Sequence, residues 1–271
     1  MSGTERPQDS FDLQAMDAAL RGSRFEGKLH FFPEIGSTNT HAMQQAEAGA
    51  PDGSVYFADE QSAGRGRGAH AWESPPGSGL YVSILLRPRI APADILWLSL
   101  AAGLAVRDAV RRVTSLEADL RWPNDLLFGR KKFCGILTEL NAEVTRVRHA
   151  VIGIGINVHQ ESFPDELRAI ATSLHVETGR AWPRQELLIA LLQSLDCEVA
   201  ALTAARDPLA SARGMRQRLE AASTWIRGKR VRVEEGEGYA GTTDGLDPRG
   251  FLLVRTAEGL RTVYSGGVRE S

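Results

Sequence analysis

The strongest chemical signal in the sequence is an arginine-glycine run, Gly64-Arg65-Gly66-Arg67-Gly68, which follows Gln61 and precedes Trp72. Glycine tolerates positive φ angles and lets the backbone approach a ligand closely, and each arginine offers a planar fork of N–H donors. Such donors recognise phosphate and carboxylate oxygens. Because ordering a loop costs roughly 1–2 kcal/mol of backbone entropy per residue, we expect this segment to become ordered only around an anion.

A second cluster combines an amide, a carboxylate and an ammonium group. Trp122-Pro123-Asn124-Asp125 is followed by Lys132 and by an apolar strand that contains Gly135. Together these groups can hold the phosphates of a magnesium nucleotide. Pro-Asn-Asp alone is common turn chemistry, so the interpretation depends on Lys132 and on the glycine, since a glycine inside a strand often marks the close approach of a ligand.

Two further stretches each have a structural and a functional interpretation. Gly153-Ile154-Gly155-Ile156-Asn157 is a β-branched strand with two glycines and a polar end, and the glycines either admit a ligand or let a helix pack closely. Ser37-Thr38-Asn39 either contacts a ligand or caps the helical segment that follows it. The residues alone leave both alternatives open.

Several common chemistries lack support. Gly64 to Ala69 match the spacing of a dinucleotide fingerprint, but the residues after them cannot open the required helix, and no P-loop pattern occurs. The six histidines show no metal-ligand spacing, and there is no GxSxG motif. A net charge of −2 conflicts with general nucleic-acid binding, although the arginine-glycine run alone could belong to an RNA-binding linker.

The cysteines and the apolar segments indicate the compartment. Cys134 and Cys197 lie far apart and form no CxxC or Cys/His pattern, so we expect buried thiols in a reducing cytoplasm. The first residues are acidic and polar, unlike a signal peptide. The most apolar stretch, Ile95 to Val106, is shorter than the roughly 20 residues that cross a bilayer, and we interpret it as a core helix.

The apolar periodicity predicts an α+β fold with a mixed or antiparallel central sheet and flanking helices. Helices are expected at 41–48, from after Pro92 to about 113, and from 184 to about 222. Strands are expected at 29–32, ending at Pro33, and at 54–58, 80–86, 119–122, 125–128, 133–140 and 150–158. The last four should be antiparallel, because tight turns join them.

These elements divide the chain into three parts. Residues 1–28 are expected to form a tail with a short helix, residues 29–222 the main ligand-binding domain, and residues 223–271 a small β-barrel. The Gly-rich insert 61–79 lies between two strands of the main domain, and mobile inserts of this length are usually functional or disordered.

Taken in order, the motifs resemble those of the biotin protein ligases. The series is Gly36-Ser37-Thr38-Asn39, Gln61 with Gly64-Arg65-Gly66-Arg67, Trp122-Pro123-Asn124-Asp125, Lys132 with Gly135-Ile136-Leu137, and Gly153-Ile154-Gly155-Ile156-Asn157. One such motif would be weak, whereas five in order at family-like spacing are specific. The resemblance runs from about Leu29 to the C-terminus, and it implies a class II synthetase-like catalytic domain followed by an SH3-like β-barrel.

The resemblance also implies roles for individual residues. The residues implied to bind biotin are Ser37, Thr38, Asn39, Gln61, Arg65, Gly66, Arg67, Lys132, Gly135, Gly153 and Gly155. Those implied to bind ATP are Arg65, Arg67, Trp72, Asn124, Asp125, Lys132 and Asn157. Lys132, Arg65 and Arg67 would be catalytic, with Lys132 neutralising charge between the biotin carboxylate and the ATP α-phosphate, and Asp125 would contact Mg²⁺.

The implied reaction has two steps. The biotin carboxylate attacks the α-phosphorus of ATP and pyrophosphate leaves; an acceptor lysine then attacks the acyl carbon of biotinyl-5'-AMP. The expected acceptor is the biotin carboxyl carrier protein or domain of acetyl-CoA carboxylase. We expect a cytoplasmic monomer or homodimer without DNA or membrane partners, because residues 1–28 are too short for the winged helix of regulatory members.

One departure from the family pattern and two rival functions complete the prediction. After the GRGR core the chain has Gly68-Ala69-His70-Ala71, where many relatives place another Arg or Asn, so phosphate binding or loop closure could differ. The rivals are a lipoate-type ligase, whose pocket must admit a dithiolane chain, and a non-catalytic biotin-binding module. The presence of Lys132 and two loop arginines favours an enzyme.

Overall fold

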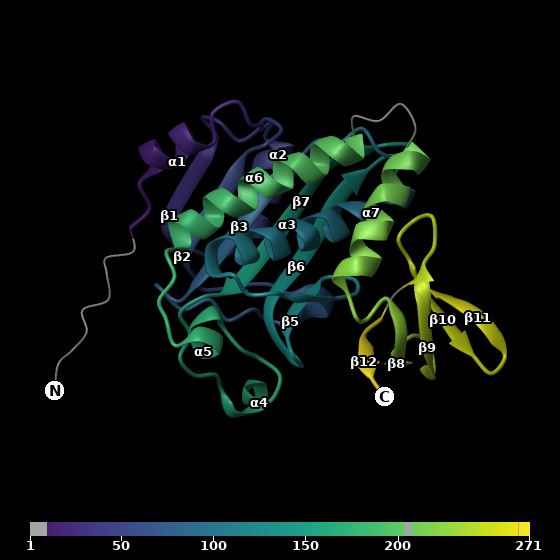
Figure 1. Ribbon diagram of the computed structural model, residues 1–271. Coiled ribbons are helices and arrows are strands. Elements are labelled where there is room, and N and C mark those ends of the chain that lie inside the picture. Colours follow the sequence, from purple (N-terminus) through teal and green to yellow (C-terminus); the bar gives the residue numbers. More distant parts are fainter. Residues whose placement is uncertain (1–9, 204–207, 265) are drawn as a thin grey trace.

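The computed structural model describes residues 10–203, 208–264 and 266–271. It shows an α+β main domain and a smaller β domain at the C-terminal end (Figure 1). Residues 1–9, which belong to the expected N-terminal tail, lie outside the described residues. The remainder of that tail contains the expected short helix, α1 (Leu13–Ala19), which Asp12 caps by accepting hydrogen bonds from two backbone N–H groups.

Helices and strands alternate irregularly along the main domain. Its helices are α2 (Thr38–Glu47), α3 (Leu96–Thr114), α4 (Asp165–Arg168), α5 (Leu174–Thr178), α6 (Arg184–Thr203) and α7 (Pro208–Ala222), with short 3-10 turns at Arg67–Ala69 and Pro92–Asp94. Its strands are β1 (Leu29–Ile35), β2 (Val55–Gln61), β3 (Gly79–Leu86), β4 (Asp119–Arg121), β5 (Asp125–Phe128), β6 (Lys131–Ala142) and β7 (Val147–Asn157).

The seven strands form one mixed sheet in the order β1-β2-β3-β7-β6-β5-β4. β1 and β2 are parallel, and all other neighbours are antiparallel. The predicted fold class is therefore confirmed, as is the antiparallel arrangement of the four strands β4 to β7 that tight turns connect.

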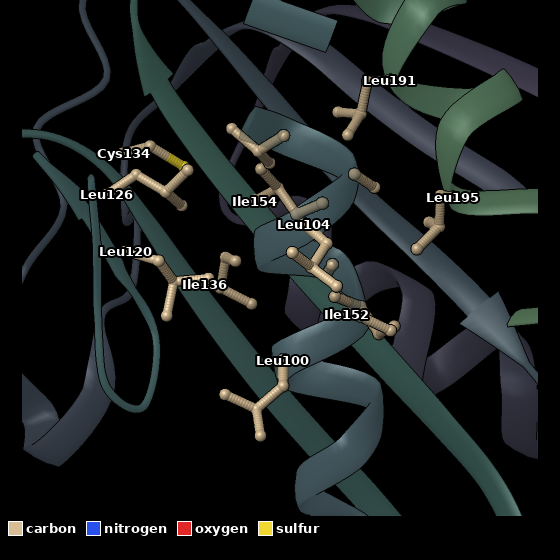
Figure 2. Packing of buried hydrophobic residues seen from close by; sticks show 14 of the residues in the cluster. Leu100, Leu104, Leu120, Leu126, Cys134, Ile136, Ile152, Ile154, Leu191 and Leu195 are labelled. Atoms are coloured by element: carbon tan, nitrogen blue, oxygen red, sulfur yellow. The ribbon is translucent and has the colours of Figure 1, made fainter. Parts of the chain in front are cut away.

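The main core lies between one face of this sheet and the helices α3 and α6 (Figure 1). Alternate residues of β6 and β7, including Ile136, Ile152 and Ile154, pack against Leu100 and Leu104 of α3 (Figure 2). Burying one such side chain stabilises the fold by about 1.5–3 kcal/mol. This face is occupied by packed helices, so a ligand must bind elsewhere.

The opposite face is covered in part by α2. Ala42 and Ala46 of this helix pack on Tyr56, Leu85 and Val151, which belong to β2, β3 and β7. The α2 helix therefore covers one region of this face, and the Gly-rich insert between β2 and β3 covers another, as the contacts of Trp72 described below show.

The C-terminal domain is a five-stranded antiparallel sheet in the order β11-β10-β9-β8-β12. Its strands are β8 (Arg227–Val233), β9 (Tyr239–Leu246), β10 (Leu252–Thr256), β11 (Gly259–Val263) and β12 (Val268–Glu270). It packs against the main domain where the Trp122 indole donates a hydrogen bond to the Gly250 carbonyl, 2.9 Å away. Gly250 also lies against Leu100, since a Cβ there would be 2.9 Å from its side chain. The SH3-like β domain is thus confirmed.

Four sequence-based predictions differ from the structure. The helix expected at 41–48 begins earlier, at Thr38, because Ser37 caps it. The first strand does not end at Pro33 but continues to Ile35, which is possible because β1 is an edge strand and needs no N–H there. The helical segment expected from 184 to about 222 is two helices, α6 and α7, that run in different directions (Figure 1); residues 204–207 between them lie outside the described residues. Cys134 is buried as expected, but Cys197 is exposed.

A buried ion pair connects α6 to the end of β2. The Arg184 side chain is 3% exposed and donates to Asp59, 2.7 Å away, and Asp59 also accepts a hydrogen bond from the backbone N–H of Gly77. Breaking a buried pair costs about 3–5 kcal/mol. We expect Asp59→Ala to lower the free energy of unfolding by about 3 kcal/mol, the lower end of that range, because the Asp59 side chain is 29% exposed.

Urea denaturation checks this prediction, with Asp165→Ala as the control. Asp165 pairs with Arg168 at the surface, where both side chains are more than two-thirds exposed. Such pairs contribute roughly 0–1 kcal/mol. Equal destabilisation by the two substitutions would contradict the structural role assigned to the Arg184–Asp59 pair.

Candidate functional site

Strand pairing brings the strand glycines together on the face opposite α3 and α6. Gly135 of β6 lies opposite Gly155 of β7, and Asp125 of β5 lies opposite Gly135. In the next row Gly153 lies between Ser83 of β3 and Leu137 of β6. We call Gly135, Gly153 and Gly155 the glycine face.

The neighbours of the glycine face decide between the two interpretations left open by the sequence. A Cβ at Gly155 would be 2.5 Å from the Trp72 ring, and one at Gly135 would be 3.0 Å from it. A Cβ at Gly153 would be 2.5 Å from the amide oxygen of Asn39 in α2. Close helix packing therefore accounts for Gly153, whereas Gly135 and Gly155 face a loop.

That loop is the predicted arginine-glycine segment, and it has a defined conformation. Trp72 donates a backbone hydrogen bond to the Gly64 carbonyl (3.0 Å), and Gly66 donates one to the His70 carbonyl (2.7 Å). Gly68 adopts φ +67°, which favours glycine, and so permits the turn. These hydrogen bonds pair residues 64–66 with residues 70–72 and place the Trp72 indole on the glycine face.

Buried polar side chains meet beside the glycine face. Thr38 donates its N–H and hydroxyl to the Gln61 amide oxygen at 2.9 and 3.0 Å. The Ser83 hydroxyl lies 2.8 Å from the Thr38 hydroxyl and 3.0 Å from the Asn39 amide oxygen. Gln61 in turn donates to Ser74. The structure thus brings Thr38, Asn39 and Gln61 together.

Ser37 has a different role in this structure. Its hydroxyl accepts a hydrogen bond from the Thr40 N–H (3.4 Å) at the beginning of α2. This is the helix-capping alternative. Ser37 is 7% exposed and directly precedes Thr38 and Asn39, so it fixes the helix end that presents those two side chains.

Glu139 completes the cluster, although the sequence motifs did not include it. Its carboxylate accepts two hydrogen bonds from the Arg65 guanidinium, at 2.9 and 3.0 Å, and one from the Asn39 amide at 2.5 Å. Side chains alternate between the faces of a strand, so Glu139 shares the face of Gly135 and Leu137. That alternation is the signal that could have identified it.

Lys132 reaches the same face because of a β-bulge. Register shifts between β5 and β6, so that Leu126 pairs with Cys134 but Leu127 pairs with Lys132, leaving Phe133 as an extra residue. In a regular strand Lys132 and Gly135 would point to opposite faces. With the bulge, a Cβ at Gly135 would be only 2.9 Å from the Lys132 ammonium.

Two charged side chains, Asp125 and Arg121, and the Trp72 ring surround that ammonium group. Lys132 Nζ lies 2.6 Å from Asp125, and the Arg121 guanidinium lies 2.6 Å from the other Asp125 oxygen. Burial raises the pKa of Asp125, but the charges of Lys132 and Arg121 outweigh it, and the pKa lies below its usual value. Asp125 is therefore ionised at neutral pH. Lys132 Nζ also lies 5.3 Å from the Trp72 ring centroid.

The other predicted nucleotide contacts lie at the edge of this cluster. The Asn124 amide donates to the Ile136 carbonyl (2.9 Å) and fixes the turn before β5. The Asn157 amide donates to the Thr172 carbonyl (3.0 Å) at the end of β7. Arg67 donates to the Gly266 carbonyl (3.3 Å), so it points to the small β domain and away from Arg65.

The arrangement can bind an anionic ligand. Arg65 and Lys132 place two cations along one face of the sheet. The glycine face lies between Lys132 and the hydrogen-bonded network that contains Thr38 and Asn39. Fixed cations of this kind stabilise charge that develops on phosphate and carboxylate oxygens. Among the described residues, no group of three or more His, Cys, Asp or Glu could hold a metal ion.

The packing of Trp72 on glycine leads to a testable prediction. In Gly155→Ala the new methyl group would meet the indole at 2.5 Å, so the ring must move, at a cost of about 1–3 kcal/mol. The tryptophan emission spectrum should shift toward that of an exposed indole. Gly214→Ala is the control, because a Cβ there meets nothing within 4 Å. A shift that persists in a Trp72→Phe background would contradict the assignment.

Family models match both domains. Residues 31–157 match the model described as "Biotin/lipoate A/B protein ligase family", and residues 227–268 match "Biotin protein ligase C terminal domain". The first match includes the glycine face, the loop and Lys132.

Individual proteins match over most of the chain. A biotin–(acetyl-CoA carboxylase) ligase of Mycobacterium tuberculosis is 35% identical over 98% of each chain. A bifunctional ligase/repressor BirA of Bacillus spizizenii is 37% identical over 86% of this chain and 71% of its own length. The structure of an Aquifex aeolicus biotin protein ligase in complex with biotin and ATP is similar with a TM-score of 0.77, at 31% identity, over 90% of this chain and 100% of that one.

Proposed function

The chain belongs to the biotin protein ligase family and is an ATP-dependent biotin ligase, and from this premise we propose how its own residues carry the reaction. The proposal rests on one observation: two cations, Arg65 and Lys132, flank a strip of glycine backbone beside a buried hydrogen-bonding network. The network suits the polar head of biotin, and the cations suit its carboxylate and the phosphates of ATP.

In the first step the biotin carboxylate oxygen forms a bond to the α-phosphorus of ATP, and the bond to pyrophosphate breaks. Two anions must approach each other, so their repulsion is the main barrier that the protein can lower. Lys132 lies in a fixed position, held by Asp125 and by backbone hydrogen bonds to the segment around Ile170 and Thr172. We assign it to the carboxylate and the α-phosphate, as a donor that needs no reorganisation.

Thr38, Asn39 and Gln61 are assigned to the ureido end of biotin. They have amide and hydroxyl groups within one network, and the Asn39 amide packs directly on the backbone of Gly153. Gly66 and Arg67 are assigned to the loop tip over the ligand. The contact of Arg67 with Gly266 suggests that it also links the loop to the small β domain.

Trp72, Asn124 and Asn157 are assigned to the nucleotide side of the site. Trp72 occupies the glycine face next to Lys132, so a ligand ring must share that face with the indole or displace it. A closed loop would also keep water from biotinyl-5'-AMP, a reactive mixed anhydride, until an acceptor lysine attacks its acyl carbon and AMP leaves.

Asp125 does not form a protein magnesium site by itself. Its two oxygens are paired with Lys132 and Arg121, and among the described residues no group of three or more His, Cys, Asp or Glu could hold a metal ion. We propose that Mg²⁺ accompanies ATP as its phosphate counter-ion, and we derive no step through a protein-bound metal.

We propose the biotin carboxyl carrier protein of acetyl-CoA carboxylase as the acceptor, on the basis of the name of the Mycobacterium tuberculosis relative. We further propose a cytoplasmic enzyme in which residues 29–222 catalyse the reaction and residues 223–271 support the loop, acting as a monomer or homodimer without a DNA partner. No helix among the described residues is long and apolar enough to span a membrane.

Incubation with labelled biotin, ATP, Mg²⁺ and a biotin carrier domain tests the proposal. We expect label on the carrier and none when ATP is omitted. Lipoate in place of biotin separates the ligase from its lipoate-type rival, and release of pyrophosphate separates it from a non-catalytic binding module. Label transfer from lipoate but not from biotin would overturn the substrate assignment.

A further inference from the structure

Glu139 of β6 connects two parts of the site that are far apart in the sequence. One of its oxygens accepts from both Arg65 and the Asn39 amide, and the other accepts from Arg65 alone. Arg65 belongs to the loop and Asn39 to α2, so one carboxylate on the sheet holds both. We propose that Glu139 is a positioning residue that sets the closed loop and the orientation of the Asn39 amide together.

In this structure the Glu139 carboxylate takes the place of the anionic ligand that the sequence predicts for the loop. The loop was expected to become ordered only around an anion, and Glu139 is an anion supplied by the chain itself. Its side chain is 27% exposed and that of Arg65 is 48% exposed, so water still competes for the pair and the loop can open. Glu139 therefore favours the closed loop without locking it.

The contact also leaves Arg65 able to act on a substrate. A guanidinium has five N–H donors in a fixed fork, and the pair with Glu139 engages its two terminal nitrogens on one side. The remaining donors keep a defined direction because the carboxylate binds in a bidentate manner. Glu139 thus orients the Arg65 guanidinium, and the two side chains can stay paired when Arg65 binds a substrate carboxylate.

The contact with Asn39 fixes which end of that amide faces the polar network. The amide nitrogen donates to Glu139, and the amide oxygen lies 3.0 Å from Ser83 and against Gly153. A neutral amide at position 139 could accept or donate, so the Asn39 amide would no longer have a single preferred orientation. Glu139 thereby determines whether Asn39 presents an acceptor or a donor beside Ser83.

The first test needs no substrate, because it measures the free loop. Trypsin cleavage after Arg67 is followed in wild type and in Glu139→Gln, with Glu143→Gln as the control. Glu143 lies at the far turn between β6 and β7, where it pairs with Arg146 and Arg148. We expect cleavage in Glu139→Gln to be about 1.5- to 5-fold faster, the change that loss of a partly exposed ion pair gives, and unchanged in Glu143→Gln.

Arg65→Gln supplies the partner substitution. It removes the same ion pair from the exposed side, and cleavage after Arg67 can still be measured. We expect it to raise that cleavage rate as Glu139→Gln does, and the double variant to show no further increase, since only one contact is lost. Additive effects of the two substitutions, or an unchanged cleavage rate in both variants, would overturn the proposal that the Arg65–Glu139 contact holds the loop closed.

The second test is kinetic and rests on the proposed function. In Glu139→Gln we expect the KM for biotin to rise roughly tenfold while the KM for ATP stays within about twofold, because Asn39 is assigned to biotin alone and the Arg65 guanidinium itself remains available to the phosphates of ATP. A merely structural role would change both constants, or the thermal midpoint, and would overturn the proposal. If wild type forms no biotinyl-5'-AMP the proposed function fails, yet the cleavage experiment still decides the Arg65 contact.

Discussion

Lys132→Ala is expected to slow biotin-dependent exchange of pyrophosphate into ATP by about 10²–10³-fold, the usual effect of removing one preorganised donor at a developing charge. The ammonium lies over Gly135, where the absence of a Cβ lets a carboxylate or phosphate approach closely, and it is fixed by Asp125. The fold should persist because Asp125 keeps its pair with Arg121. The KM for each substrate should change much less than kcat, because the positive charge acts mainly as the two anions join.

Lys131→Ala is the matched control for this experiment. It removes the same charge one residue earlier in β6, opposite Phe128 and not over the glycine face. We expect near-normal exchange from it. A similar loss in both variants would indicate a general electrostatic effect, and near-normal exchange in Lys132→Ala would remove this lysine from the mechanism.

Arg65→Ala is expected to lower kcat/KM for biotin by roughly 10–100-fold, the range for a hydrogen bond that involves a charged group. The substitution removes the substrate contact and the Glu139 pair together, so its effect should exceed that of Glu139→Gln. We also expect more biotinyl-5'-AMP to escape into solution, because the loop closes less often. Release is measured by trapping the free adenylate with an amine.

Arg146→Ala is the control for the loop arginine. Arg146 is a surface residue that pairs with Glu143 at the turn between β6 and β7. It should leave adenylate formation and release unchanged. If Arg65→Ala forms and retains the adenylate as wild type does, the loop arginine has no role in the first step.

The elements of the fold could be predicted where apolar periodicity is strong. The long helix α3 and the antiparallel strands β4 to β7 follow directly from their patterns and turns. The end of β1 could not be predicted, because whether Pro33 stops a strand depends on which neighbour the strand has. Exposure of Cys197 likewise depends on which face of α6 meets the sheet, and that is a tertiary property.

The site could be predicted as a set of residues but not as a geometry. The motifs identified Thr38, Asn39 and Gln61, which the structure joins in one network. The position of Lys132 does not follow the regular alternation of side chains along a strand. A β-bulge, which no local sequence pattern predicts, turns Lys132 to the glycine face. Its position relative to Gly135 therefore required the strand register.

Glu139 and Ser83 escaped detection for a related reason. Ser83 is a polar residue inside the apolar strand β3, and Glu139 lies two residues beyond the Gly135-Ile136-Leu137 motif, next to Thr138 in the polar part of β6. Alternation along β6 places Glu139 on the same face as Gly135, but the pairing of β3, β7 and β6 is needed to bring Glu139 and Ser83 together beside Asn39. Glu139 and Ser83 could have been identified from the sequence if the strand order had been known.

The most direct test of the account is a crystal structure of the protein grown with biotin and a non-hydrolysable ATP analogue. We expect the biotin carboxylate within about 3.5 Å of the Lys132 ammonium, with the ureido ring beside Asn39 and Thr38 and the glycine face beneath the ligands. Biotin bound on the other side of the sheet, or a glycine face covered by Trp72 alone while both ligands bind elsewhere, would contradict it.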